Sequence, residues 1–288
     1  MLEQNLLYLK QPNDRYLIHN KLQRMAKKDM TFILGAKCID GAVMVGDTKV
    51  TIGEGTDYTY AQKLMRPFPI SVLGASGATG LFNSFQSRMQ VAFAEQAKQG
   101  KKFDTHEEIK TLVENVIREM HRAYKEDRYF LVNNLNVLMG IRINPIPELV
   151  NFTGLGLPEP VNGIKVIGHG EPYGALFIKK MWNPKMTMEQ TAKLALFVIK
   201  LICETEIDAS VGYRSTDFLP QVFYLPNVLV DIPKDINPLE LPKFVADMHR
   251  VKYPIQELPA ETVRSFMNEV GSMVSGFEKL FVDGHFKI

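Results

Sequence analysis

Cysteine and long apolar runs are both scarce in this sequence. Two of the 288 residues are cysteines, Cys38 and Cys203, and such a pair cannot form the disulfide framework of a small secreted protein. Both lie in apolar segments, so we expect each to be a small core residue. No apolar run approaches the roughly 20 residues that a membrane-spanning helix needs. The start, MLEQNLLYLKQPNDRYL, lacks the basic head and uninterrupted apolar core of a secretory signal. The sequence therefore predicts a cytoplasmic protein.

An excess of charge of either sign is also missing. The chain has 34 Lys and Arg against 32 Asp and Glu, a formal net charge of +2. This balance leaves no strong positive field for phosphates, so we expect no nucleic-acid partner. The densest basic run, KLQRMAKK at residues 21–28, has two interpretations as a helix: binding to an anionic membrane surface, or packing against its own chain or a sister subunit. We favour packing and expect no membrane partner.

Signals for metal and nucleotide binding are weak. The six histidines never occur at the i, i+4 spacing of a helical metal site, and no cysteine pair accompanies them. The glycine-rich segment GASGATG, residues 74–80, leads from a strand into a helix but lacks the Gly-Lys-Ser/Thr ending of a phosphate-binding loop. We therefore expect no metal and no cofactor. The glycines instead allow the strand end and the helix start to come close to another group.

The spacing of apolar residues separates the chain into blocks of strands and blocks of helices. Two short strands flank the turn at residues 38–41. Capping boxes begin two of the expected helices, one formed by Thr105 and Glu108 and the other by Thr187 and Gln190. Further strands are expected at residues 68–76, 129–143, 147–154, 162–170 and 221–232, and helices from about residue 80 and at 105–124, 187–206 and 261–281.

Strands and helices in separate blocks, rather than in strict alternation, indicate an α+β fold with antiparallel sheets. We expect one sheet to pack on another, with helices outside. No internal repeat or low-complexity linker divides the chain. The domain prediction is an N-terminal extension at residues 1–29, one domain at residues 30–237 and a C-terminal helical addition at residues 238–288.

Five residues able to do chemistry follow one another in a specific order. Thr31 heads the first strand, Asp47 and Lys49 end the second, Lys63 follows a polar stretch, and Gly77 lies in the glycine-rich turn before a helix. This order resembles the proteasome family of N-terminal-nucleophile hydrolases. The resemblance covers residues 31–225, because VIGHGEPYG at 166–174, MTMEQTAKLALFVIKLI at 186–202 and IDASVGY at 207–213 are similar to later segments of that family.

The resemblance implies a four-layer sandwich, with two antiparallel sheets flanked by helices, and a role for each residue. Thr31, as the first residue of a mature chain, would supply both the hydroxyl nucleophile and the α-amine base. Lys63 would lower the pKa of that amine, and Asp47 would keep Lys63 charged and oriented. The amide of Gly77 would stabilise the oxyanion. Supporting roles would fall on Lys49, His169, Asp208 and Ser210, with His169 standing where catalytic members usually have a serine.

The resemblance also implies a function and its alternatives. We expect a threonine peptidase subunit that hydrolyses polypeptide substrates in intracellular protein catabolism, inside a ring of its own copies or of sister subunits. The first alternative is a structural or gating ring subunit without catalysis, in which Asp47 and Lys63 form an ordinary ion pair. The second is an amidase or transpeptidase that uses the same nucleophile on a particular partner.

The residues before Thr31 distinguish these functions. Met30 precedes Thr31, whereas self-processing members of the family have glycine there. The segment QPNDRYLIHNKLQRMAKKD, residues 11–29, is similar to the start of the family's non-catalytic outer-ring subunits, where it stays attached. A different possibility is that translation starts at Met25 or Met30. Removal of Met30 by an aminopeptidase would then free the amine of Thr31.

Overall fold

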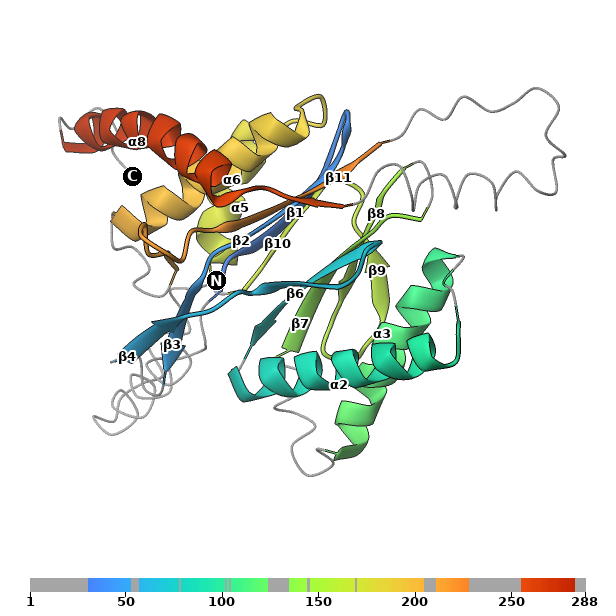
Figure 1. The fold of residues 1–288 in the computed structure, drawn as a ribbon. Helices are drawn as coiled ribbons and strands as arrows, with labels where there is room; N and C mark the ends of the chain where they lie inside the picture. The colour runs from blue at the N-terminus through green and yellow to red at the C-terminus, as the bar shows by residue number, and fades with distance from the viewer. Residues whose placement is uncertain are drawn as a thin grey trace, which may run out of the picture.

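The chain folds into four layers, in which two β-sheets pack face to face and helices cover both outer faces (Figure 1). The computed structural model describes residues 31–52, 57–77, 79–101, 103, 105–123, 135–143, 146–168, 170–204, 211–227 and 255–282. The predicted extension at residues 1–29 lies outside these ranges, as does the predicted boundary at residue 238. The α+β sandwich expected from the sequence is confirmed.

The first sheet has the strand order β10-β1-β2-β11-β12, and every neighbouring pair is antiparallel. Its strands are β1 Ile33–Cys38, β2 Gly41–Gly46, β10 Ile164–Ile167, β11 Gln221–Pro226 and β12 Gln256–Glu257. In β1, Ile33 faces the second sheet and Leu34 faces the helices, because alternate residues of a strand point to opposite faces. Both faces of this sheet are therefore covered, which explains why β1 and β2 are almost entirely apolar.

The second sheet has the order β5-β6-β7-β8-β9 and is also antiparallel. Its strands are β5 Leu64–Phe68, β6 Ser71–Gly77, β7 Leu135–Ile141, β8 Glu148–Phe152 and β9 Pro158–Pro160. A separate hairpin, β3 Lys49–Ile52 with β4 Asp57–Tyr60, extends from the end of β2. The chain thus passes from the first sheet through this hairpin to the second.

Helices cover each sheet from outside (Figure 1). The pair α2 Thr79–Lys98 and α3 His106–Ala123 packs on the second sheet, and α5 Glu171–Met181, α6 Met188–Glu204 and α8 Ala260–Val282 lie over the first. Both predicted capping boxes are present. The amide of Glu108 donates to the Thr105 hydroxyl over 3.3 Å, and the amide of Gln190 donates to the Thr187 hydroxyl over 3.2 Å.

The C-terminal helix α8 belongs to the same core as α6. Val263, Met267, Val270 and Val274 of α8 are buried with α6 residues in one apolar cluster. Lys193 of α6 also reaches Glu269 of α8 over 2.7 Å. The sequence predicted the helix, and the structure supplies the surface on which it packs.

Several regions differ from the sequence-based expectations. The expected strand at 68–76 is β6, which begins only at Ser71 because the chain turns at residues 69–70, and strands β4 and β5 before this turn were not predicted. Helix α5 was not predicted, since Pro172 and Gly174 both disfavour a helix interior. Pro172 lies in the first turn, where a missing N–H costs little. Gly174 lies where a Cβ would come within 2.6 Å of the Phe32 ring, so close packing requires the glycine.

Cys38 and Cys203 are both free thiols and partly buried, as expected for small packing residues. Burial raises the pKa of Cys38 to about 11, so this thiol is protonated at neutral pH. Among the described residues, no helix is long and apolar enough to span a bilayer, and no group of three or more His, Cys, Asp or Glu is arranged to hold a metal ion.

Candidate active site

Thr31 lies two residues before the start of β1, with its main chain held on two sides. The amide of Gly170 donates to the Thr31 carbonyl over 3.3 Å, and the amide of the next residue, Phe32, donates to Asp47 Oδ1 over 2.8 Å. Thr31 is 7% exposed. These contacts fix Thr31 between the end of β2 and the turn that leads from β10 into α5.

Asp47 and Lys63 form a buried ion pair beside Thr31. Lys63 Nζ donates to Asp47 Oδ1 over 2.7 Å, and the Gly212 amide donates to Asp47 Oδ2 over 3.2 Å. Burial raises the pKa of the Asp47 carboxyl, whereas Lys63 and the amides of Phe32 and Gly212 lower it. Because all of these groups are donors, the carboxylate is the form that satisfies them. Asp47 therefore holds the Lys63 side chain in one orientation.

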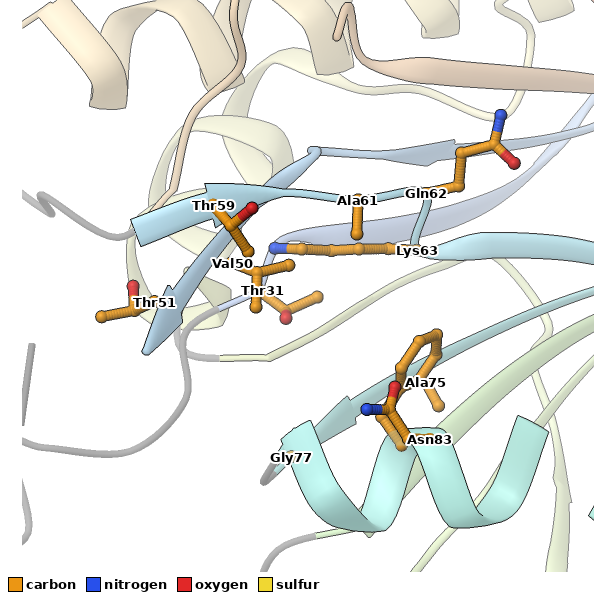
Figure 2. Close-up of a pocket in the computed structure, with 11 residues that line it drawn as sticks. Thr31, Val50, Thr51, Thr59, Ala61, Gln62, Lys63, Ala75, Gly77 and Asn83 are labelled. Atoms are coloured by element: carbon orange, nitrogen blue, oxygen red, sulfur yellow. The ribbon is translucent and has the colours of Figure 1, made fainter. Parts of the chain in front are cut away.

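A pocket of about 210 Å³ opens next to Thr31 (Figure 2). Thr31 and Lys63 line it on one side, and Gly77 and Asn83 line it on the side of α2 (Figure 2). The remaining lining residues are Val50, Thr51, Thr59, Ala61, Gln62, Ala75 and Phe82. The pocket thus lies between the two sheets at the edge where the β3–β4 hairpin leaves the first sheet.

Gly77 ends β6 with a φ of 136°, a conformation that favours glycine. Four residues predicted from the sequence, Thr31, Asp47, Lys63 and Gly77, are therefore brought together: three of them line the pocket, and the fourth, Asp47, accepts a hydrogen bond from the Lys63 side chain. Their catalytic roles stay predictions at this point. Their proximity is what the chemistry of a threonine nucleophile would require.

The supporting residues are placed differently. Lys49 begins β3, and its Nζ lies 4.6 Å from the centre of the Tyr58 ring on the neighbouring strand. It is not among the residues that line the pocket. His169, Asp208 and Ser210 lie outside the described residues, so their predicted roles stay predictions.

Sequence reasoning missed two residues that hold the site together. Gly212 lies in the segment IDASVGY, but its amide contact to Asp47 leaves no mark in the sequence. Gln221, the first residue of β11, bonds to the main chain at Lys63 and Leu64. A single glutamine at the start of a strand gives no signal of such a contact.

A family model described as "Proteasome subunit" matches residues 29–214 of this chain. The chain belongs to the proteasome subunit family. The match spans more than half of the 288 residues and contains Thr31, Asp47, Lys63 and Gly77. The resemblance drawn from the order of those residues is thereby confirmed at the level of the family. No curated protein matches the chain.

Solved structures with the same fold include bacterial proteins named Anbu. The Anbu from Yersinia bercovieri, described as an ancestral beta-subunit, has 16% identity and a TM-score of 0.62, covering 87% of this chain and 96% of its own. The Gly-1 mutant of Anbu from Hyphomicrobium sp. strain MC1 has 16% identity and a TM-score of 0.61, covering 86% and 96%. A second Anbu structure from that strain has 16% identity and a TM-score of 0.57, covering 86% and 97%. At this identity the likeness shows the N-terminal-nucleophile fold of this proteasome-family subunit.

Proposed function

We propose that this subunit is a threonine peptidase that hydrolyses peptide bonds with Thr31 as its nucleophile. The observation that supports it most directly is that Thr31 and Lys63 line one pocket, while the fully buried Asp47 holds the Lys63 ammonium. An ion pair with no functional role is more often at the surface, because burying two charges costs several kcal/mol, on the order of the whole stability of a domain. Retaining this pair beside a hydroxyl in an accessible pocket favours a chemical role.

The mechanism needs a mature chain that begins at Thr31. Its α-amine, with an ordinary pKa of about 7.7–8.0, then takes the hydroxyl proton as Oγ bonds to the scissile carbonyl carbon. The Lys63 ammonium favours the unprotonated amine by repulsion. The peptide C–N bond breaks, and the leaving amine takes the proton. Water then hydrolyses the ester on Thr31, which releases a carboxylic acid and restores the hydroxyl.

The other wall of the pocket would stabilise the transition state. The amide of Gly77 is the proposed donor to the oxyanion, an interaction that contributes about 3–4 kcal/mol in other hydrolases. The free rotation of the Thr31 hydroxyl is restricted by its β-methyl group, which helps to orient Oγ. Both groups would act on the same carbonyl between the two sheets.

The pocket favours an apolar side chain on the substrate. Val50, Ala61, Ala75 and Phe82 contribute apolar surface next to Thr31. The one described cation in the lining, Lys63, is already paired with Asp47, so it adds little attraction for an acidic substrate side chain. We therefore propose peptides with an apolar residue before the scissile bond as substrates.

We also propose that the subunit works in a ring of its own copies or of sister subunits, as its family membership suggests. Sedimentation of the native protein should then give a particle several times larger than the 32.7 kDa chain. A monomer at micromolar concentration would contradict ring assembly.

The catalytic proposal is tested by comparing two preparations of the chain. One begins at Met1 and the other at Met30, so that the host can remove the methionine, and intact-mass analysis establishes the first residue of each. The form that begins at Thr31 should cleave fluorogenic peptides with an apolar residue before the scissile bond and react with a threonine-directed electrophile. The form that keeps residues 1–30 should do neither, because an amide nitrogen is not basic.

Two variants of the form that begins at Thr31, called the short form, serve as controls. Thr31→Ala should abolish cleavage and labelling, while Thr31→Ser should keep a measurable part of both, because it retains the hydroxyl. If the short form starts at Thr31, assembles, and still neither cleaves nor reacts, the peptidase proposal is wrong.

Retention of residues 1–30 in the native protein would instead favour a structural or gating ring subunit. Transfer of the acyl group to an amine rather than to water would favour a transpeptidase.

A further inference from the structure

Gln221 joins the two sheets at the point where Lys63 enters the active site. It is the first residue of β11 and pairs with Gly46, the residue directly before Asp47. Its side chain points from the first sheet to the start of β5 in the second, and the residue is 7% exposed. Gln221 therefore lies next to the strand end that carries Asp47 and contacts the segment that carries Lys63.

The Gln221 amide makes three hydrogen bonds to two consecutive residues. Its Oε1 accepts from the amides of Lys63 and Leu64, both over 2.8 Å. Its Nε2 donates to the Leu64 carbonyl over 3.0 Å. One side chain thus satisfies donors and an acceptor of the main chain in the way that a neighbouring strand would.

The main chain at Lys63 has special need of such support. Residues 61–63 belong to no strand, and the pairing of β5 with β6 begins only at Leu64. The long Lys63 side chain must still deliver its ammonium to Asp47 and to the pocket of Thr31. An error of about 1 Å in such a position can cost a factor of about 100 in rate.

We propose that Gln221 is a positioning residue that holds the Lys63 main chain so that its ammonium lies between Asp47 and Thr31. This role rests on the proposed peptidase function, although its geometric part stands without it. Gln221 itself does not line the pocket of Thr31 and is not a catalytic residue. It acts through Lys63.

Replacing Gln221 by methionine removes all three hydrogen bonds at similar side-chain volume. The residue also borders a second pocket of about 230 Å³, which gives the new side chain room to adjust. We therefore expect the variant to fold. Gln221→Glu is the conservative variant, since a carboxylate keeps acceptors for the two amides and loses the donor to Leu64.

The first readout does not depend on activity. Lys63 is 4% exposed, so reductive methylation with formaldehyde should modify it slowly in the wild-type protein. In Gln221→Met, mass spectrometry should find Lys63 modified at least about fivefold faster, with Gln221→Glu intermediate. Gln256→Met is the matched control, because Gln256 is an exposed glutamine on the neighbouring strand β12 of the same sheet.

The second readout is the kinetics of the form that begins at Thr31. For Gln221→Met we expect kcat to fall about 10- to 100-fold with KM within threefold, in line with the cost of a misplaced catalytic group. The acidic limb of the kcat/KM profile should move to higher pH, because a displaced Lys63 no longer lowers the pKa of the Thr31 amine. A loss of folded protein alone would lower the apparent kcat without moving this limb.

The outcomes separate the two proposals. If the wild-type form that begins at Thr31 has no activity, the peptidase proposal is wrong. The methylation rate of Lys63 still decides whether Gln221 holds Lys63. The role of Gln221 is overturned if the wild type is active and Gln221→Met shows the same Lys63 methylation rate, the same kcat and the same acidic limb of the pH profile. If Gln221→Met does not fold, Gln221→Ser decides, because its side chain is too short to reach the main chain of Lys63, and wild-type reactivity and kinetics in that variant overturn the role equally.

Discussion

The carbonyl oxygen of Thr31 occupies the space that a side chain on Gly168 would need. A Cβ atom on Gly168 would stand 1.9 Å from that oxygen, and Gly168 has a φ of 100°. Gly170, two residues later, donates its amide to the same oxygen. Gly168 and Gly170, between β10 and α5, therefore contact the main chain of the candidate nucleophile Thr31. Glycine at position 168 makes the close approach to the Thr31 carbonyl possible.

Gly168→Ala should displace Thr31. The positive φ alone costs on the order of 1–3 kcal/mol of unfolding free energy, and the overlap with the Thr31 carbonyl adds to it. We expect a lower melting temperature and the loss of labelling at Thr31. Gly100→Ala is the matched control, since Gly100 also has a positive φ, 66°, but no atom within 4 Å of an added Cβ. Gly100→Ala should lower the unfolding free energy by about 1 kcal/mol and keep the labelling at Thr31. If Gly168→Ala and Gly100→Ala lower the melting temperature equally and both keep labelling at Thr31, the contact between residue 168 and Thr31 is unimportant.

Lys63→Met should affect both activity and stability. It leaves the buried Asp47 carboxylate without its cation, a change that typically lowers the unfolding free energy by about 3–5 kcal/mol. It also removes the charge proposed to activate Thr31, so peptide hydrolysis should fall about 10²- to 10⁴-fold.

The double variant Lys63→Met with Asp47→Asn separates these effects. Because no charge stays buried, chemical denaturation should find much of the lost stability restored, while hydrolysis should stay as low as in the single variant. Restored hydrolysis in the double variant would remove Lys63 from the mechanism.

His106 should make stability depend on pH. Its Nδ1 lies 2.7 Å from Glu148, and its Nε2 accepts from the Ile143 amide, which requires the neutral ring. Burial lowers the pKa of His106 below its ordinary value of 6.5, although Glu148 opposes the shift. The unfolded chain therefore binds a proton more readily than the folded one.

The sign of the expected change follows from that lowered pKa. The part of the unfolding free energy that depends on the neutral His106 ring is fully present above about pH 6.5. It is lost as the pH falls from there through the lowered pKa of His106 in the folded state. Thermal melts should give a lower melting temperature at pH 5.5 than at pH 7.5. His106→Gln should reduce this difference, because it removes the ring that binds the proton. An unchanged difference would assign the pH dependence to other groups.

Two methionines on α8 test whether the C-terminal helix is part of the core. Met267 is 5% exposed and packs in the cluster shared with α6, whereas Met273 is 54% exposed. Met267→Ala should lower the unfolding free energy by about 2–5 kcal/mol, the usual cost of a core truncation. Met273→Ala should change it by less than about 0.5 kcal/mol. Equal effects in urea denaturation would mean that α8 does not share the core in solution.

Local patterns in the sequence determined most of the elements. The capping boxes at Thr105 and Thr187 marked two helix starts because their hydrogen bonds join residues three positions apart. Helix α5 escaped prediction because the Phe32 ring that requires Gly174 comes from a distant part of the chain, directly before β1. Strand β5 escaped prediction because Arg66 and Pro67 interrupt its apolar residues.

For the site, the sequence supplied the residue types and their order, from which Thr31, Asp47, Lys63 and Gly77 were selected. The fold alone decided their partners: Gly212 and Gln221 lie 165 and 158 positions along the chain from Asp47 and Lys63. Hydrogen bonds over such separations depend on how two sheets pack, and no spacing in the sequence encodes them. The sequence by itself therefore determined which groups could react, and the packing of the sheets decided what holds them in reach of one another.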